Sequence, residues 1–169
     1  MNNSDQFIIR ESQKSEYREI TDLSIKVWKT AYKGLIDDQI LNNLSGEERL
    51  KGRIQWFTEP NKFSIIAMDK EKIIGFGDFG ISRHLKYGKG EIYALYVLPE
   101  YQGHGAGKLL MQEAMCQLKQ KSLTPYIVVT LETNLPAQKF YQSIGFKFIG
   151  NVFTCIGEKK YKENVYIID

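Results

Sequence analysis

Cysteine is scarce in this sequence, which contains only Cys116 and Cys155. Cys116 has no cysteine or histidine close by in the sequence with which it could form a metal site. Disulfides are rare in the reducing cytoplasm, so a chain with so few cysteines needs no oxidising compartment. We therefore predict two reduced, at least partly buried thiols, a cytoplasmic location and no bound metal.

Long apolar runs and blocks of positive charge are missing as well. No run approaches the roughly 18 apolar residues of a membrane-spanning helix, and the polar start of the chain is unlike a signal peptide. The net charge of +3 suits an anionic cofactor, but no stripe of lysine and arginine is present for nucleic acid. The sequence thus predicts neither a membrane nor a nucleic acid as partner.

The rest of the composition is that of an ordinary globular protein. With 43% hydrophobic and 25% charged residues over 169 positions, the chain is long enough to bury one sizeable core. No internal repeat, low-complexity tract or linker divides it. We expect a single domain over residues 1–169.

Hydrophobic periodicity predicts an α/β chain in which helices lie between runs of strands. One apolar helical face consists of Gly107, Leu110, Met111, Ala114 and Leu118. Residues 126–131 form a dense β-branched run, which is typical of a strand buried on both faces. The expected strands are 7–11, 63–68, 73–81, 91–98, 126–131, 147–156 and 164–168. The expected helices are 16–33, 37–57 with a break near Ser45–Gly46, 107–118 and 134–144.

Three glycines at alternate positions lie between a predicted buried strand and a predicted helix. Gly103, Gly105 and Gly107 follow the strand at 91–98 and lead into the next helix. At a helix start the unpaired backbone N–H groups and the helix dipole point the same way, and together they attract an anion such as phosphate. The stretch therefore predicts a phosphate-binding loop.

Two common phosphate-loop patterns do not fit this stretch. A Walker A loop needs glycine where the chain has Gln102, and Ser or Thr where it has Leu109. The dinucleotide pattern anchored at the first glycine needs glycine where the chain has Lys108. The pattern that fits is Arg or Gln, two residues, Gly, one residue, and Gly or Ala. It is satisfied by Gln102, Gly105 and Gly107.

A second motif follows about thirty residues later. It runs Asn134-x-x-Ala137-x-x-Phe140-Tyr141-x-x-x-Gly145-Phe146. With the two motifs in this order and separation, the chain resembles the GCN5-related N-acetyltransferase (GNAT) superfamily across nearly its whole length. The resemblance implies an α/β (α+β) GNAT fold: a mostly antiparallel, strongly twisted mixed sheet of about seven strands, flanked by about four helices. The central strands at 91–98 and 126–131 would splay apart.

The resemblance also implies acetyl-CoA as cofactor. The backbone at the end of the first central strand would bond the pantetheine amides, and the glycine loop would receive the pyrophosphate. Asn134 would bond the pantetheine arm, although a helix N-cap alone would also explain an asparagine there. The implied cofactor-binding residues are Leu95, Tyr96, Val97, Gln102, Gly103, His104, Gly105, Ala106, Gly107, Lys108, Asn134, Ala137 and Tyr141.

Two residues match catalytic positions of the family. Tyr141 matches the general acid that protonates the departing CoA thiolate; transfer from a phenol near pKa 10 to a thiolate near 8.5 is uphill by only about 2 kcal/mol. Glu91 matches the glutamate that serves as general base in the histone-acetylating branch, often through water. An alkylammonium near pKa 10.4 must lose a proton before it attacks a thioester. Ordered water without Glu91 is the alternative.

The acceptor side is expected between the first two helices and the loop before the central strand. Trp28, Tyr32, Tyr93 and Tyr96 would supply aromatic faces for an amine-bearing substrate. Trp28 also suits the core by its helical spacing. His84 lies in the loop before the central strand, from which it could reach the mouth of the acceptor pocket. These residues leave the identity of the acceptor open.

The leading interpretation is an acetyl-CoA-dependent N-acetyltransferase of bacterial type. It would transfer acetyl to a primary amine by direct attack in a ternary complex. One alternative is a non-catalytic acyl-CoA-binding or regulatory module with the same fold. Another is a transferase that modifies a protein or peptide amine rather than a small molecule. The expected partner is a small-molecule or peptide amine, and the sequence leaves a homodimer open.

Overall fold

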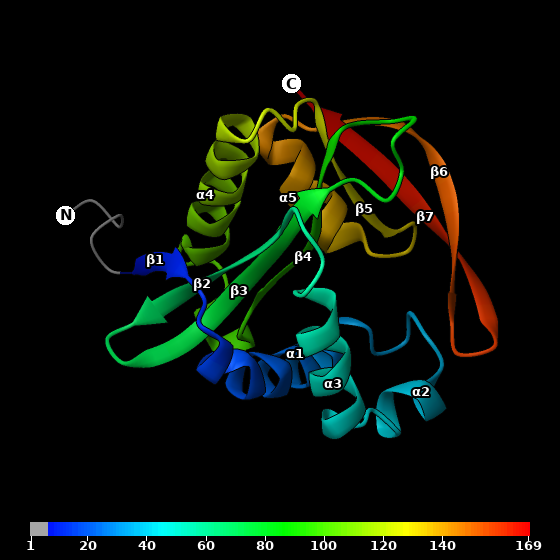
Figure 1. Cartoon of the computed structure of the whole chain (residues 1–169). Helices are drawn as coiled ribbons and strands as arrows, with labels where there is room; N and C mark the ends of the chain where they lie inside the picture. The colour runs from blue at the N-terminus through cyan, green and yellow to red at the C-terminus, as the bar shows by residue number, and fades with distance from the viewer. Residues whose placement is uncertain (1–6) are drawn as a thin grey trace.

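The computed structural model describes residues 7–169 as one seven-stranded mixed sheet covered by helices (Figure 1). The strand order is β1-β2-β3-β4-β5-β7-β6, and every neighbouring pair is antiparallel except β4 with β5. The strands are β1 (Ile8–Glu11), β2 (Lys62–Asp69), β3 (Lys72–Ile81), β4 (Gly90–Val97), β5 (Tyr126–Leu131), β6 (Lys147–Ile156) and β7 (Lys159–Ile168). The α-helices are α1 (Tyr17–Ala31), α2 (Asp38–Asn42), α3 (Gly46–Trp56), α4 (Ala106–Gln120) and α5 (Leu135–Ile144). Short 3-10 helices are η2 (Lys14–Glu16) and η3 (Pro99–Tyr101).

The sheet separates two hydrophobic clusters because its strands alternate their side chains. On β2, Ile65 and Ala67 belong to the cluster under α4, whereas Ile66 belongs to the cluster under α1. The α4 face predicted from the sequence is buried, and α5 packs beside it through Phe140 and neighbouring residues. The core of the fold thus lies on both sides of β2, β3 and β4, so β4 is packed on both of its faces.

The two central strands, β4 and β5, separate partway along their length. β4 and β5 pair only from Gly90 to Ile92, opposite Tyr126 to Val128. On the other edge of β4, Ala94 pairs with Asp78 while Ile92 pairs with the next residue of β3, so Tyr93 is the extra residue of a β-bulge. The rest of β4 has no strand partner on the β5 side. The predicted splay of the central strands is confirmed.

Three expectations need correction. Residues 7–169 contain five α-helices rather than about four, because the predicted break near Ser45–Gly46 is confirmed and divides 37–57 into α2 and α3; Ser45 caps α3 by accepting a hydrogen bond from the Glu48 N–H. β7 begins at Lys159 rather than at residue 164, because its polar first half pairs with the exposed edge strand β6. Both cysteines are exposed, so their predicted burial was wrong. Cys116 lies on the solvent side of α4 and Cys155 on β6.

No helix within residues 7–169 combines the length and apolarity needed to cross a membrane.

Candidate functional site

The glycine loop joins the end of β4 to the start of α4. Gly103 and Gly105 adopt φ angles of 79° and 96°, the left-handed region that glycine enters without strain. A Cβ at either position would meet no atom within 4 Å, so the loop faces open space. No side chain caps the start of α4, and its first N–H groups are left for a ligand. The loop therefore has the geometry of an anion site.

Gln102 holds this loop against the strand that precedes it. Its Nε2 donates a hydrogen bond to the Val97 carbonyl oxygen at 2.9 Å. Gln102 itself is exposed, as are His104 and Lys108, whereas Ala106 is buried at the first position of α4. The contact of Gln102 is with the backbone of β4, so its side chain fixes where the loop lies relative to the splayed strand.

Asn134 begins α5 on the opposite side of the splay. Its Oδ1 accepts a hydrogen bond from the Ala137 N–H at 3.3 Å, so the asparagine is an N-cap, as its sequence position allowed. Its Nδ2 donates to no protein group among residues 7–169, which leaves both of its N–H donors for a ligand. The capping role and the expected ligand contact are therefore compatible.

Tyr141 lies on α5 among other aromatic side chains. Its ring packs against Phe140, Phe146 and Tyr166, with ring centroids 5.6, 6.0 and 6.5 Å away. Burial raises the pKa of the Tyr141 phenol, and nearby Tyr96 raises it further. Tyr141 is protonated at neutral pH, and its raised pKa strengthens its hold on that proton.

Glu91 is fully buried in the part of β4 that still pairs with β5. Its Oε2 accepts a hydrogen bond from the Arg83 backbone N–H at 2.8 Å, and its Oε1 accepts from Arg83 Nε at 3.0 Å. A guanidinium–carboxylate pair of this kind is strong because both groups are charged. The carboxylate therefore lies two residues before the bulge at Tyr93 and is shielded by Arg83.

A second carboxyl group lies near this ion pair. Burial raises the pKa of Glu163 on β7, while Arg83 lowers it and Glu91 raises it, so Glu163 is within electrostatic range of both. The sequence prediction missed this residue because it began β7 one residue too late to include it.

Three of the four predicted aromatic residues meet at one point. The hydroxyl groups of Tyr96 and Tyr32 are hydrogen-bonded to each other at 3.0 Å. The Tyr96 hydroxyl also accepts a hydrogen bond from Trp28 Nε1 at 3.1 Å. Burial raises the pKa of Tyr32 well above its usual value, and Tyr96, Tyr141 and Glu163 each raise it further. A hydrogen-bonded aromatic cluster of Trp28, Tyr32 and Tyr96 therefore connects the C-terminal end of α1 with β4.

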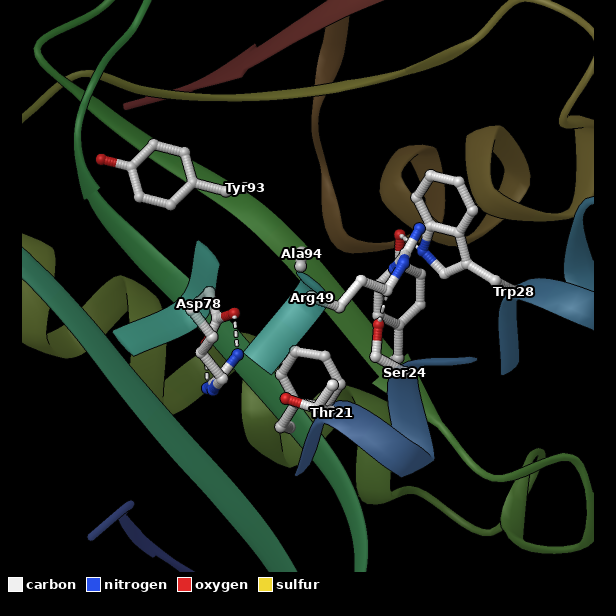
Figure 2. Close-up of a pocket in the computed structure, with 10 residues that line it drawn as sticks. Thr21, Ser24, Trp28, Arg49, Asp78, Tyr93 and Ala94 are labelled. Atoms are coloured by element: carbon white, nitrogen blue, oxygen red, sulfur yellow. Dashed lines mark hydrogen bonds and ion pairs between the residues drawn. The ribbon is translucent and has the colours of Figure 1, made fainter. Parts of the chain in front are cut away.

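This cluster borders a pocket of about 260 Å³ between α1, α3 and the sheet (Figure 2). The pocket is lined by Thr21, Ser24, Trp28, Arg49, Arg53, Phe76, Asp78, Tyr93, Ala94 and Tyr96. Of the residues expected on the acceptor side, Tyr93 lines this pocket but His84 does not; the His84 backbone N–H donates to Ser82 Oγ. The predictions from sequence missed the three charged residues in this list.

Two arginines of α3 enter the pocket from the same helix face. Arg53 forms a paired contact with Asp78, with Nη1–Oδ2 and Nη2–Oδ1 distances of 2.7 and 2.9 Å. Arg49 lies one helical turn earlier, and its guanidinium carbon is 4.1 Å from the centre of the Trp28 ring. The spacing of four residues was the only sequence signal that both would face the same way.

Comparison with known proteins gives consistent relatives. A model described as the acetyltransferase (GNAT) family matches residues 28–146. The uncharacterized N-acetyltransferase YuaI of Bacillus subtilis is 31% identical over 137 residues, which cover 80% of this chain and 77% of that protein. A mycothiol acetyltransferase of Catenulispora acidiphila is 32% identical over 94 residues, but this match covers 54% of this chain and only 29% of that longer protein.

A solved structure has the same fold. The crystal structure of the PaiA N-acetyltransferase from Thermoplasma acidophilum in complex with coenzyme A matches with a TM-score of 0.72 at 21% identity. The match covers 94% of this chain and 97% of that one.

Proposed function

We propose that this chain, which belongs to the acetyltransferase (GNAT) family, transfers the acetyl group of acetyl-CoA to a primary amine by direct attack in a ternary complex. The enzyme class and the cofactor predicted from the sequence are confirmed by its relatives. One observation carries the proposal further. The stretch of β4 from Tyr93 to Val97, which pairs with β3 but not with β5, lies between the glycine loop and the aromatic pocket, so two ligands can meet there.

The residues around the splay fit a bound CoA thioester. On the edge that faces β5, the backbone from Leu95 to Val97 offers hydrogen bonds to amides, and the open glycine loop before α4 offers N–H groups to a pyrophosphate. The free Nδ2 of Asn134 supplies a further donor, with Ala137 in the same first turn of α5. When bound, acetyl-CoA supplies the activated acetyl group.

Tyr141 is the proposed general acid. Its buried phenol keeps its proton at neutral pH and holds that proton for the sulfur that leaves. The same burial makes the phenol a weaker acid, but apolar surroundings also raise the pKa of a thiol. Both pKa values rise, so their difference grows by less than the shift of the phenol alone. Proton transfer from the phenol to the thiolate, which costs about 2 kcal/mol for free groups, therefore becomes only partly more costly.

Glu91 is the proposed proton acceptor, and it acts through water. Its carboxylate is buried and hydrogen-bonded by Arg83, so an amine in the pocket does not reach it directly. One intervening water is sufficient for a general base. Ordered water without a carboxylate remains the alternative mechanism, and the effect of a Glu91→Gln substitution distinguishes the two.

The experiment that tests the function measures release of free CoA from acetyl-CoA in the presence of amines. We expect turnover with at least one class among amino acids, polyamines, aminoglycosides and peptide N-termini. Tyr141→Phe should lower kcat by about a hundredfold or more, since a positioned acid contributes about that factor, while cofactor affinity stays within about twofold. Stabilisation of the protein by acetyl-CoA in a melting experiment reports that affinity separately.

Two results would overturn the proposal. If saturating acetyl-CoA leaves the melting temperature unchanged, the site does not bind the cofactor. If Tyr141→Phe acetylates the amine as fast as the original protein, Tyr141 is not the acid. Binding without turnover on any amine would support the alternative of a non-catalytic regulatory module.

A further inference from the structure

Arg49 is a cation in the acceptor pocket that the protein leaves without a carboxylate. Its one side-chain hydrogen bond goes to Ser24 Oγ and is long, at 3.4 Å. Its guanidinium lies over the Trp28 ring (Figure 2). Across residues 7–169 no aspartate or glutamate pairs with it, although nine ion pairs form elsewhere in that range.

The other charges of the pocket are already matched. Arg53 donates to both oxygens of Asp78 and to Ser64 Oγ, so that ion pair is closed within the protein. Tyr93 and Tyr96 are uncharged at neutral pH, as tyrosines ordinarily are, and burial raises their pKa further. The lining therefore carries one uncompensated positive charge, and it belongs to Arg49.

Arg49 is half-buried, so its guanidinium has lost part of its hydration. Burial lowers the pKa of Arg49, but an arginine side chain stays charged in a protein. Contact with the indole compensates for part of its lost hydration, because the ring face attracts a cation. Only one N–H of the planar fork is used by Ser24, so the others remain available. A guanidinium fork fits a carboxylate through two parallel hydrogen bonds.

We propose that Arg49 binds the carboxylate of the acceptor, so that the acceptor is a small amine that also carries a carboxylate, as amino acids do. This inference deepens the proposed function and rests on it. The pocket of about 260 Å³ suits a compact molecule of that kind, and its aromatic walls would contact the rest of it. A polyamine or aminoglycoside is disfavoured, because its ammonium groups would meet Arg49 without a negative charge to offset the repulsion.

The test compares L-alanine, L-methionine and L-tyrosine, each with its own carboxamide, by turnover and by calorimetric titration in the presence of CoA. The carboxamide keeps the size and the amine but loses the charge. For at least one amino acid we expect the acid to be favoured over its carboxamide by about tenfold to a hundredfold, which is the range of a charge-assisted hydrogen bond. The preference should lie mainly in KM, because Arg49 binds a part of the acceptor that does not react.

Three variants identify Arg49 as the source of that preference. Arg49→Met should bring the ratio of acid to carboxamide to within about twofold, and Arg49→Lys should leave an intermediate ratio. Ser24→Asp places a carboxylate beside Arg49 and should also abolish the preference without removing the arginine. Arg18→Met is the matched control, since Arg18 is an exposed arginine on α1 paired with Glu47, and its ratio should not change.

The outcomes separate the two proposals. If no amine is acetylated but amino acids bind in a way that depends on Arg49, the transferase proposal fails and the carboxylate site stands. If the carboxamides or spermidine are preferred, or if Arg49→Met and Ser24→Asp keep the preference for the acid, the carboxylate site is refuted. Preferred binding of O-phosphoethanolamine would mean that Arg49 binds a phosphate, and the carboxylate site would be refuted. Failure of the protein to bind any of these amines or acids would also refute the carboxylate site.

Discussion

The Asp78→Asn substitution should cost the fold a large part of its stability. Asp78 and Arg53 are only 12% and 9% exposed at their side chains, and their contact has two hydrogen bonds. The guanidinium also packs against the rings of Tyr17, Phe57 and Phe76. Asparagine removes the negative charge and leaves a buried cation without its partner. Breaking a buried ion pair in this way costs about 3–5 kcal/mol in the free energy of unfolding.

Urea unfolding followed by circular dichroism measures this loss directly. For a chain of this size, the same change lowers the melting temperature by about 6–20 °C. Glu47→Gln is the matched control, since it breaks the Arg18–Glu47 pair, whose side chains are 48% and 70% exposed. Exposed pairs contribute less than about 1 kcal/mol.

The reasoning is refuted if Asp78→Asn loses no more stability than Glu47→Gln. A double variant, Arg53→Met with Asp78→Leu, adds a second check. It removes both charges at once, so it should lose less stability than Asp78→Asn alone, because no charge is left buried without a partner.

Two further predictions concern protons. Glu91→Gln should lower turnover by about a hundredfold and alter its pH profile if Glu91 accepts the proton; an unchanged profile would assign that role to water. Stability should fall above about pH 10, by up to about 1.4 kcal/mol per pH unit for each of Tyr32, Tyr96 and Tyr141. Their pKa is raised in the folded protein, so the unfolded chain loses these protons first and is favoured as the pH rises. Urea unfolding at several pH values would show a shallower fall in Tyr141→Phe, and equal slopes would contradict the assignment.

Much of the fold follows from local patterns. The run 126–131 and the apolar face of α4 are local features, so periodicity alone located them. Family membership came from the motifs around Gly105 and Tyr141, and the comparisons confirm it. The first half of β7 was missed because its polar residues resemble a loop until pairing with β6 is known.

The pocket between α1, α3 and the sheet could not be predicted in the same way. Arg53 and Asp78 are 25 positions apart in the chain, and only the packing of α3 on β3 makes them partners. Arg49 looks like any charged residue of an exposed helix until Trp28 of α1 is seen beneath it. Pairing and desolvation of charges are tertiary properties, so a single sequence does not contain a local signal for them.

The bulge at Tyr93 explains how one strand serves both halves of the site. In a regular strand, side chains alternate between the two faces, so residues 93 and 96 would point in opposite directions. The extra residue resets this alternation, and Tyr93, Ala94 and Tyr96 all line the pocket, while Leu95 and Val97 pack in the α4 cluster. The same irregularity lies where β5 separates from β4. The bulge therefore lies where β4 loses its pairing with β5, and it turns Tyr93 and Tyr96 toward the same pocket.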